Sequence, residues 1–329
     1  MRRRQILYAA MGQGLAAAGP AHGATPAALT WRRRDWLGFG TTLSLRAGGH
    51  DEALLERALD ASVQAVRTIE AQMSLHDPGS ALSRLNREGR LPNPPPELLA
   101  VLRLSQWVAR HSGGAFDVTV QPLWLAFDAA RQDARLPRAA EVAAARARVG
   151  WQGLQVTPRG VEFTRPAMSA TLNGVAQGYA CDRVRDVLRA HGVQHALIDT
   201  GELAPLGHNP ADGPWRLGLV NPRDEHALLA RVLADGRCLA TSADEPSSFS
   251  TDHRHHHIFD PASGYSPAGL ASVTVAARSG ALADALTKVM FVAGPAQIAA
   301  LAARWQVDAL WVDKLGCQGA TAGWRLASA

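Results

Sequence analysis

Four polar segments, each containing glycine, hold the side chains of this chain that could carry out chemistry. The first, residues 73–86, contains three serines, a turn and a closing asparagine. The second, residues 113–122, places a pair of glycines before Phe116 and Asp117. Paired glycines let a backbone come close to a ligand, while Phe116 could pack on a planar ring and Asp117 could bond a sugar or a ring nitrogen. The simpler interpretations are a capped surface loop for the first segment, and a glycine helix cap with a core phenylalanine for the second.

The third segment, residues 171–182, has glycines at the start of a predicted helix. A helix start presents free backbone N–H groups and the positive end of the helix dipole, which together can bind a phosphate. The run Asn173-Gly-Val-Ala-Gln-Gly178 is neither a Walker loop nor a Gly-x-Gly-x-x-Gly pattern. Two interpretations therefore stay open, a phosphate site and an ordinary helix start.

The fourth segment combines the run His255-His-His-Ile-Phe-Asp-Pro-Ala-Ser-Gly264 with residues 283–288. The Asp-Pro-x-x-Gly pattern is typical of a turn, which would fix the preceding histidine in place. Asp284 lies one helical turn from Thr287 or Lys288, so it shares a helix face with either of them. A carboxylate with hydroxyl and backbone oxygens suits Mg²⁺ better than zinc. One alternative is that Asp284 is only a carboxylate near a helix N-terminus. Another is a zinc-binding module made of His253, His255, His256 and His257.

Helices and short strands must bring these segments together. Capping residues, prolines and apolar residues spaced by three and four predict helices at 51–73, 94–108, 139–149, 173–191, 279–292 and from 295 onward. Alternating apolar residues predict strands at 37–45, 196–198, 217–220, 231–233, 238–241, 258–259, 272–275, 309–312 and 324–326, and a hairpin at 154–163. Residues 74–90 are polar and rich in turn-forming residues, which predicts turns rather than a helix or strand there. This mixture favours an α+β or mixed α/β fold over a regular parallel sheet.

Composition limits the classes to which the chain can belong. Its 329 residues are 47% hydrophobic and 19% charged, which suits a soluble globular protein with a substantial core. The formal net charge is +5, of which Arg2, Arg3 and Arg4 supply three charges, so nucleic acid is not expected as a partner. The three cysteines lie far apart without a Cys-x-x-Cys pair, which argues for small buried thiols.

Residues 1–24 have the pattern of an export signal. Arginines precede an apolar stretch at 6–19, and a small-residue segment at 21–24 offers a cleavage site. Adjacent arginines before a weak apolar stretch suggest the twin-arginine route, and the stretch is too short to form a stable membrane span. We therefore expect an exported, periplasmic protein with one mature domain at 25–329. The alternative is a disordered basic start on a cytoplasmic protein.

The four segments, in this order and spacing, resemble the ApbE family of FAD:protein FMN transferases over about residues 39–292. The matching motifs are the serine-rich stretch ending at Asn86, Gly114-Ala-Phe-Asp-Val118, the helix start from Gly174 to Asp182, His257-Ile-Phe-Asp-Pro-Ala-Ser-Gly264 and Ala283-Asp-Ala-Leu286. The ordered set is much more specific than any single motif. The resemblance implies an α+β, ApbE-like (T-fold-like) fold of mixed, largely antiparallel sheets with packed helices.

An activity and a set of site residues also follow from the resemblance. It implies an Mg²⁺-dependent enzyme that transfers FMN from FAD, its substrate, to a Ser or Thr hydroxyl of a target protein and releases AMP. The target would be a flavin-accepting protein of a redox complex. His257 falls at a histidine often assigned to catalysis. The positions implied for FAD contact are Phe39, His76, Ala115, Phe116, Asp117, Thr171, Gln177 and Ile258. Those implied for Mg²⁺ are the backbone of Gly174, Asp284 and the residue at Lys288, with Thr287 as a substitute.

Several positions depart from the family pattern. Thr171 stands where aspartate is common, Gln177 where lysine or glutamate is usual, and residues 200–202 lack one of a pair of glycines. Lys288 stands where a threonine commonly binds metal, and its ammonium group can only donate hydrogen bonds. Either Thr287 takes over as ligand, or Lys288 partly replaces the charge of the metal.

These departures keep other functions of the same fold open. The chain could be a non-catalytic FAD carrier, or an FAD pyrophosphatase that releases FMN and AMP without a protein acceptor. A branch of the family linked to nitrous-oxide reduction has similar variations, which makes that branch a possible home for the chain.

Overall fold

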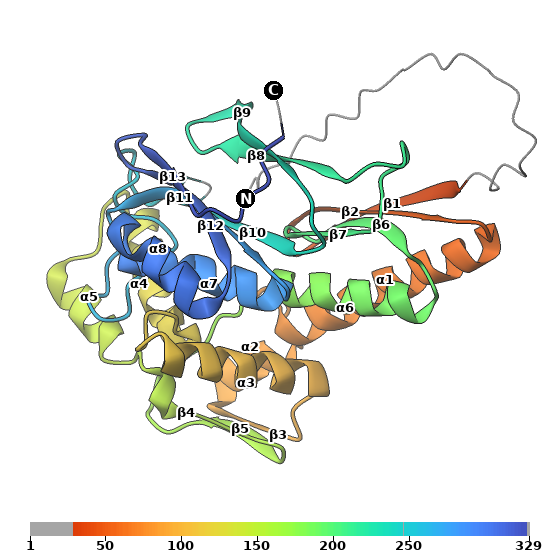
Figure 1. The fold of residues 1–329 in the computed structure, drawn as a ribbon. Helices are drawn as coiled ribbons and strands as arrows, with labels where there is room; N and C mark the ends of the chain where they lie inside the picture. Colours follow the sequence, from red (N-terminus) through yellow and green to blue (C-terminus); the bar gives the residue numbers. More distant parts are fainter. Residues whose placement is uncertain (1–28, 246, 328–329) are drawn as a thin grey trace, which may run out of the picture.

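The computed structural model describes residues 29–245 and 247–327, and its centre is an eight-stranded sheet (Figure 1). The predicted export segment at 1–24 lies outside the described residues. Neighbouring strands of this sheet pair antiparallel throughout, as the resemblance implies. In spatial order the strands are β1 (Thr30–Gly38), β2 (Thr41–Gly49), β6 (His195–Asp199), β7 (Leu203–Leu206), β10 (Cys238–Ala243), β11 (Leu270–Ala277), β12 (Asp308–Asp313) and β13 (Gln318–Ala320).

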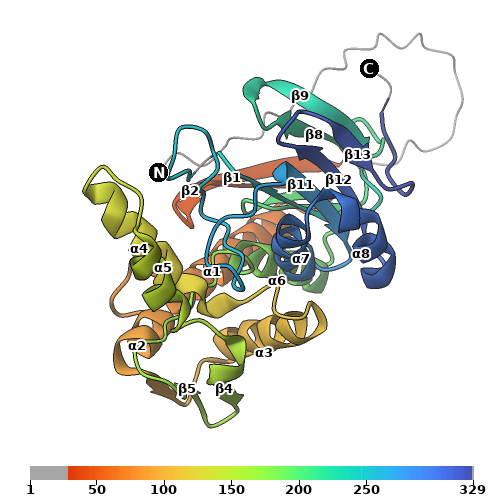
Figure 2. The same cartoon turned by 90° about the vertical axis from the view of Figure 1, so that its left-hand side faces the viewer.

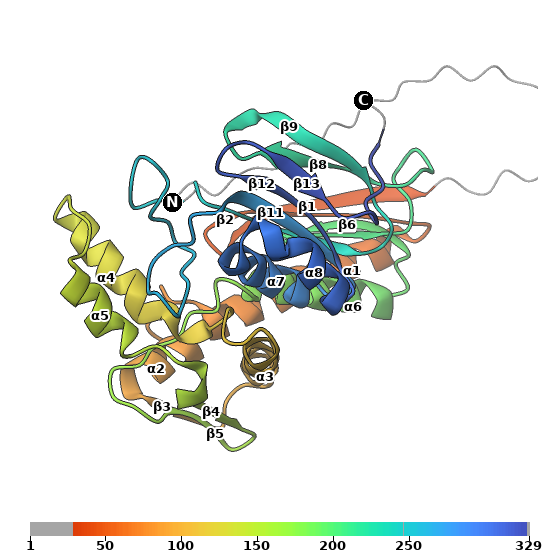
Figure 3. The ribbon, with the colours of Figure 1, turned by 60° about the vertical axis from the view of Figure 1, so that its left-hand side comes forward.

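Three long helices cover one face of the sheet and form the main core with it (Figure 3). They are α1 (Glu52–Met73), α6 (Ala176–Ala190) and α7 (Gly280–Ala293). The side chains of Asp51 and Ser279 accept hydrogen bonds from Leu54 N and Leu282 N, which confirms the predicted caps of α1 and α7. Most residues of α7 are buried, which explains why its sequence is largely apolar apart from Asp284, Thr287 and Lys288.

Helices α6 and α7 cross at close range through a pair of glycines. A Cβ atom on Gly178 would lie 2.2 Å from the carbonyl oxygen of Gly280, a clash that only glycine avoids. This crossing brings the backbone N–H of Gly178 within 3.3 Å of Asp284 Oδ2. The packing of the two helices therefore fixes the position of the Asp284 carboxylate.

The remaining elements surround this core. A ribbon of β8 (Arg216–Asn221) and β9 (Asp224–Leu233) lies over the other face of the sheet, with a second, smaller core between the ribbon and the sheet (Figure 3). A second sheet, beyond the helical layer, has the order β3 (Arg90–Pro92), β5 (Gly160–Phe163) and β4 (Leu154–Thr157). Further helices are α2 (Ala81–Glu88), α3 (Pro96–His111), α4 (Gln121–Gln132), α5 (Ala139–Arg146) and α8 (Ile298–Trp305), with short 3₁₀ turns at η1 (Val118–Val120), η2 (Trp151–Gly153) and η3 (Pro295–Gln297). Helices α4 and α5 pack on each other at one end of the molecule (Figure 2).

The single strand predicted at 37–45 is wrong, because a turn divides this segment between β1 and β2. Gly38 pairs with Thr41, so Phe39 and Gly40 form a two-residue turn. Both have positive φ, 51° and 72°, the geometry that fits the twist of a hairpin. Apolar alternation continues through Phe39, so periodicity alone does not reveal the turn.

Two helices were not predicted. Within the polar segment 74–90, Ser80 accepts a hydrogen bond from Ser83 N and caps α2, which buries Leu82 and Leu85. Helix α4 buries Leu123 and Phe127, but it follows a glycine-rich stretch and has no capping side chain. In both cases packing against the core stabilises a helix whose local signal is weak.

The strands predicted at 258–259 and 324–326 are also wrong. Residues 258–259 have no strand partner, and Leu326 forms only an isolated bridge with Val232. The short strands β3, β7 and β13 were not predicted, since three or four residues are too few to show an alternation. In the described part of the chain no single helix has the length and hydropathy to cross a membrane, and only the pair Gly280–Ala293 and Pro295–Trp305, bent by 119°, would do so by length and composition.

Candidate functional site

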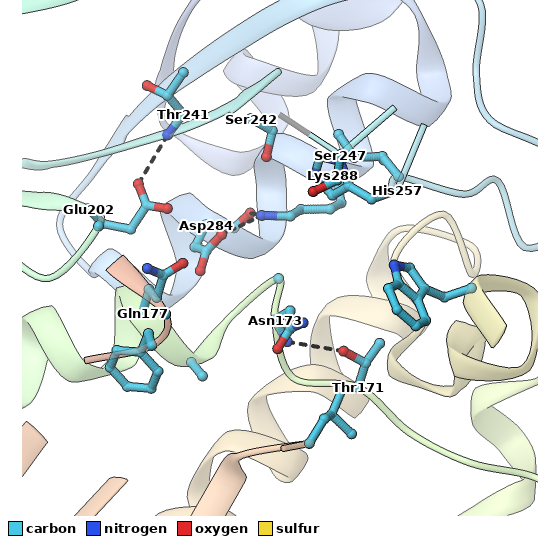
Figure 4. Close-up of a pocket in the computed structure, with 18 of the residues that line it drawn as sticks. Thr171, Asn173, Gln177, Glu202, Thr241, Ser242, Ser247, His257, Asp284 and Lys288 are labelled. Atoms are coloured by element: carbon cyan, nitrogen blue, oxygen red, sulfur yellow. Dashed lines mark hydrogen bonds and ion pairs between the residues drawn. The ribbon is translucent and has the colours of Figure 1, made fainter. Parts of the chain in front are cut away.

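A cavity of about 890 Å³ lies where the helical layer, the sheet and the surrounding loops meet (Figure 4). All four polar segments contribute to its wall. The predicted site residues that line it are Phe39, His76, Ala115, Phe116, Asp117, Thr171, Gly174, Gln177, His257, Ile258, Asp284 and Lys288. Thr287 is the one predicted site residue outside this lining. The structure thus brings together residues that are far apart in the sequence.

The hairpin turn between β1 and β2 presents Phe39 to the cavity. The backbone N–H of Phe39 donates to Glu70 Oε1 of α1 at 2.7 Å, which holds the left-handed turn in place. The Phe39 ring packs partly buried against the main core. His76, by contrast, is exposed on the loop after α1, where its N–H donates to Ser74 Oγ at 3.1 Å.

The second polar segment is first of all a helix cap. Gly113 and Gly114 have φ of 66° and 87°, and Gly114 N donates to Ala109 O at 2.8 Å, which ends α3 as the simpler interpretation predicts. Phe116 is only 5% exposed and belongs to the main core, yet it also forms part of the cavity wall. The structural interpretation of this segment is therefore confirmed, and its ligand-binding interpretation stays a prediction that the position of Phe116 on the cavity wall supports.

Asp117 anchors the loops on this side of the cavity. Its Oδ1 accepts hydrogen bonds from Thr119 N and Thr119 Oγ1, both at 2.7 Å, and its Oδ2 accepts one from Trp151 N at 2.8 Å. Burial raises the pKa of the Asp117 carboxyl, and these hydrogen bonds oppose that rise. The carboxylate thus joins the loop after α3 to the start of η2.

The start of α6 forms the floor near Gly174. Asn173 N donates to Thr171 Oγ1 at 3.3 Å, so Thr171 orders the turn before the helix. The Gln177 side chain donates through Nε2 to Thr200 O at 3.2 Å, and Thr200 Oγ1 donates to Gln177 O at 2.9 Å. These bonds give Thr200 a structural role within residues 200–202, where one glycine of the family's pair is missing. The neighbouring Gly201 remains necessary, since its φ is 94° and a Cβ there would lie 2.1 Å from Gln177 Nε2.

Asp284 and Lys288 form an ion pair on the cavity wall. Lys288 Nζ contacts Asp284 Oδ1, and it lies 3.3 Å from the Asp284 carbonyl oxygen one turn earlier on α7 (Figure 4). The Asp284 side chain is 1% exposed and that of Lys288 is 19% exposed. Thr287 is fully buried, and its hydroxyl bonds Asp284 O at 2.6 Å and Ser242 Oγ at 2.7 Å. Thr287 therefore contributes to the packing of α7 against β10.

Polar residues that were not predicted complete this wall. Glu202 is 6% exposed, and its Oε2 accepts a hydrogen bond from Thr241 N at 3.1 Å. Burial raises the pKa of the Glu202 carboxyl well above its usual value, and the negative charge of Asp284 adds to the effect. Thr241, Ser242 and Ser247 line the cavity as well. Single polar residues at the end of a short strand look like ordinary surface positions in the sequence, so only the fold reveals their place.

His257 reaches the cavity from an irregular loop. Its backbone N–H donates to Ser247 O at 3.1 Å. The preceding His256 is completely buried, with Nε2 at 3.1 Å from Pro267 O and Nδ1 accepting from Ile258 N at 3.4 Å. Burial lowers the pKa of the His256 imidazole to about 4. His256 is therefore a neutral structural residue that orients the loop from which His257 projects.

A buried ion cluster holds the same loop at its other end. Asp244 is 0% exposed and binds Arg223 at 2.6 and 2.8 Å, and it binds Lys314 at 2.5 Å. Lys314 Nζ also donates to the carbonyl oxygen of His253. Burial would raise the pKa of Asp244, but Arg223 and Lys314 outweigh it and hold the pKa below its usual value. The turn after β8, the end of β10 and the turn after β12 thus meet at one carboxylate.

The residues present do not fit the implied metal as they are arranged. In residues 29–245 and 247–327, no three His, Cys, Asp or Glu side chains come together in a way that could hold a metal ion. The four histidines of the zinc alternative therefore do not form a zinc site here. The Lys288 ammonium group already pairs with the Asp284 carboxylate, and the Thr287 hydroxyl is hydrogen-bonded to Ser242 Oγ. We therefore assign no step of a reaction to a metal.

Fold and site together define a class of protein: an α+β protein whose deep cavity combines aromatic side chains, a helix N-terminus and an acid–lysine pair. The sequence model of the ApbE family matches residues 39–311, which is most of the chain. The chain therefore belongs to the ApbE family.

Relatives of known sequence and structure agree with this assignment. The FAD:protein FMN transferase of Klebsiella pneumoniae (strain 342) is 32% identical over 287 residues, which cover 84% of this chain and 87% of that protein. The FAD:protein FMN transferase of Escherichia coli (strain K12) is 30% identical over 236 residues, 68% of this chain and 67% of that protein.

Solved structures match over most of the chain. The flavinyl transferase ApbE of Pseudomonas stutzeri, in its apo form, superposes with a TM-score of 0.79 at 29% identity, over 91% of this chain and 96% of that one. The flavin transferase ApbE of Vibrio cholerae gives a TM-score of 0.78 at 23% identity, over 89% of this chain and 98% of that one, which confirms the predicted fold.

Proposed function

We propose that this chain transfers FMN from FAD to a hydroxyl group of a target protein and releases AMP. The observation that carries the proposal is the convergence of four distant polar segments on one cavity. Relatives of the chain are named for this activity. The cavity, about 890 Å³, also has the size of a small-molecule site, for which roughly 300–1,000 Å³ is usual.

In the proposed reaction, a Ser or Thr hydroxyl of the target attacks the phosphorus atom next to riboflavin. A new phosphorus–oxygen bond forms while the bond from that phosphorus to the bridging oxygen of the diphosphate breaks. AMP leaves with the bridging oxygen and the bonding electron pair. The proton of the hydroxyl passes to His257, because an imidazole can accept a proton near neutral pH. Such a transfer depends mainly on positioning and on neutralisation of the phosphate charge.

The cavity residues suggest how the substrate is held. Phe39 and Phe116 would pack against the flavin ring, and the backbone N–H groups at the start of α6, near Gly174, would bind phosphate oxygens. The predicted FAD contacts of His76, Ala115, Asp117, Thr171, Gln177 and Ile258 belong to this proposal as well.

The resemblance also implies an Mg²⁺ ion, held at the backbone of Gly174, at Asp284 and at position 288. Two forms of the proposal are possible. A solution ion could bind once Lys288 leaves Asp284, or the charge of Lys288 could itself serve the diphosphate. The observed ion pair supports the second form.

The cellular setting is also a proposal. The export pattern at residues 1–24 supports a periplasmic protein, carried across the membrane folded by the twin-arginine route. The partner would then be an exported flavin-accepting protein of a redox complex. Cell fractionation with and without residues 1–24 tests this, and retention of the full chain in the cytoplasm would refute it.

A labelling assay tests the function itself. The purified chain is mixed with FAD and a flavin-accepting domain, with and without Mg²⁺, and the target is examined after denaturing electrophoresis. Transfer gives covalent flavin fluorescence on the target, a mass increase equal to one FMN group, and one AMP per label. A carrier would bind FAD without releasing AMP, and a pyrophosphatase would release FMN and AMP without a target. Absence of label under every condition would refute the proposed transferase.

A further inference from the structure

The side chain of Lys288 bridges the two groups expected to hold the metal. Its ammonium group contacts the Asp284 carboxylate. Its aliphatic stem lies against Gly174, where an added Cβ atom would be 3.0 Å from Lys288 Cε and 3.4 Å from Lys288 Cδ. One side chain thus fills the space between the helix start at Gly174 and the carboxylate at Asp284.

The hydroxyl of Thr287, the alternative ligand, is not placed to bind a metal here. Thr287 is fully buried and outside the cavity lining, and its hydroxyl is 2.6 Å from Asp284 O and 2.7 Å from Ser242 Oγ. A Thr287 hydroxyl turned toward the cavity would give up both contacts. The fold therefore does not position Thr287 to act as the metal ligand in place of residue 288.

Lys288 is also the more buried of the two Lys and Arg side chains that line the cavity in the described part of the chain. Of the described residues that line the cavity, only Arg131 and Lys288 are Lys or Arg. The Arg131 side chain is 54% exposed on α4 and pairs with Asp128, while that of Lys288 is 19% exposed. A substrate diphosphate at the start of α6 would accordingly find its nearest fixed positive charge at Lys288.

The composition of the chain makes a lysine at this position unusual. Of the 34 Lys and Arg residues, only Lys288 and Lys314 are lysines. Both bind a carboxylate whose side chain is at most 1% exposed, Asp284 and Asp244. An ammonium is a compact point charge, whereas a guanidinium is a broad planar fork. A compact cation is what can replace a metal ion between a carboxylate and a phosphate.

We propose that the Lys288 ammonium, positioned by Asp284, is the fixed cation of this site and replaces the divalent ion in neutralising the substrate diphosphate. An ammonium has three N–H donors. Two of them serve the Asp284 carboxylate and carbonyl oxygens, and the third can donate to a phosphate oxygen. The inference deepens the proposed FMN transferase and rests on it for the identity of the substrate.

The first test measures metal binding and does not depend on transfer. Mn²⁺ is used as the spectroscopic probe, and bound Mn²⁺ is quantified by electron paramagnetic resonance with and without FAD. The wild-type chain should bind no stoichiometric Mn²⁺, whereas Lys288→Thr should bind one ion per chain because Asp284 becomes free. Arg183→Thr, which removes a paired basic residue outside the cavity, is the matched control and should behave as wild type.

The second test measures FMN transfer in excess EDTA and in Mg²⁺. Wild type should transfer at the same rate in both. Lys288→Met, which keeps the length of the side chain without its charge, should lose about a hundredfold in EDTA, the usual effect of removing one electrostatic contact to a transition state. Lys288→Thr should depend on added Mg²⁺, and circular dichroism checks that each variant is folded.

The outcomes separate the two proposals. Stoichiometric Mn²⁺ bound to wild type, or wild-type transfer that stops in EDTA and returns with Mg²⁺, would overturn the role of Lys288. Loss of transfer in every arm would refute the transferase, and the Mn²⁺ measurement would still decide whether Lys288 excludes the metal. The Mn²⁺ measurement on the wild-type chain involves no substitution. It therefore tests the proposal even if a variant fails to fold.

Discussion

The Asp117 carboxylate accepts a hydrogen bond from the backbone N–H of Trp151 at 2.8 Å, across 34 residues of sequence. The same carboxylate binds Thr119 twice, and Thr119 Oγ1 in turn accepts a hydrogen bond from Gly150 N at 2.8 Å. A motif residue predicted for flavin binding thus also joins two loops at the cavity wall. Its loss should affect both stability and ligand affinity.

We predict that Asp117→Asn lowers the free energy of unfolding by about 1–3 kcal/mol, the cost of an unsatisfied buried polar group. An amide cannot present two acceptors, so one of its ends would place a donor against an N–H group. FAD binding should weaken in parallel, as measured by flavin fluorescence titration beside thermal unfolding. The exposed Asp133→Asn is the control and should change stability by less than about 0.5 kcal/mol. Unchanged stability of Asp117→Asn would contradict the anchoring role.

His257→Asn should remove the group that accepts the proton while leaving the rest of the cavity wall unchanged. We expect FMN transfer to fall by about 10²–10⁴-fold, the usual contribution of a general base, with little change in FAD affinity. Single-turnover labelling beside equilibrium FAD titration separates the two effects. His255→Asn, which changes a histidine outside the cavity lining, is the control and should transfer FMN at the wild-type rate. Equal loss of binding and of transfer in His257→Asn would indicate a structural role instead.

The parts of the fold that the sequence predicts are those with local causes. Asp51 and Ser279 cap α1 and α7, because a capping side chain bonds a backbone N–H only three residues away. The hairpin of β4 and β5 likewise depends on a short turn, and it lies at the predicted residues. In contrast, the turn at Phe39 depends on a contact with Glu70, 31 residues away, and periodicity cannot reveal it.

The site shows the same division between local and distant causes. Helical spacing and the turn pattern single out Asp284 and His257, the resemblance adds their roles, and the structure places both on the cavity. Glu202 remained hidden, because its burial results from the packing of β10 and α7 and not from neighbours in sequence. The two alternatives at Lys288 are open for a similar reason. Spacing puts each of Thr287 and Lys288 one helical turn from Asp284, and only the packing of Ser242 on Thr287 distinguishes them.

Asp244→Asn should release the loop that carries His257 from one of its two anchors. The change leaves Arg223 and Lys314 without their buried partner, which typically costs about 3–5 kcal/mol. We expect a lower midpoint of thermal unfolding and faster proteolysis within residues 247–257. Transfer should fall more than FAD affinity does, since the loop positions His257. Asp235→Asn, which breaks a partly exposed pair with Arg237, is the control and should leave proteolysis of the loop unchanged.

The buried His256 should make the stability of the protein depend on pH in the acid range. Its folded-state pKa is about 4 because of burial, whereas the usual value is 6.5, so the unfolded chain binds a proton that the folded chain excludes. Stability from this group is therefore complete above about pH 6.5 and falls as pH decreases toward 4, by about 3 kcal/mol in all. Denaturant unfolding of wild type and His256→Gln between these pH values measures the effect as the difference between the two curves. Gln can still donate to Pro267 O but does not titrate, so its curve should be flatter, and parallel curves would show that His256 is not the group that titrates.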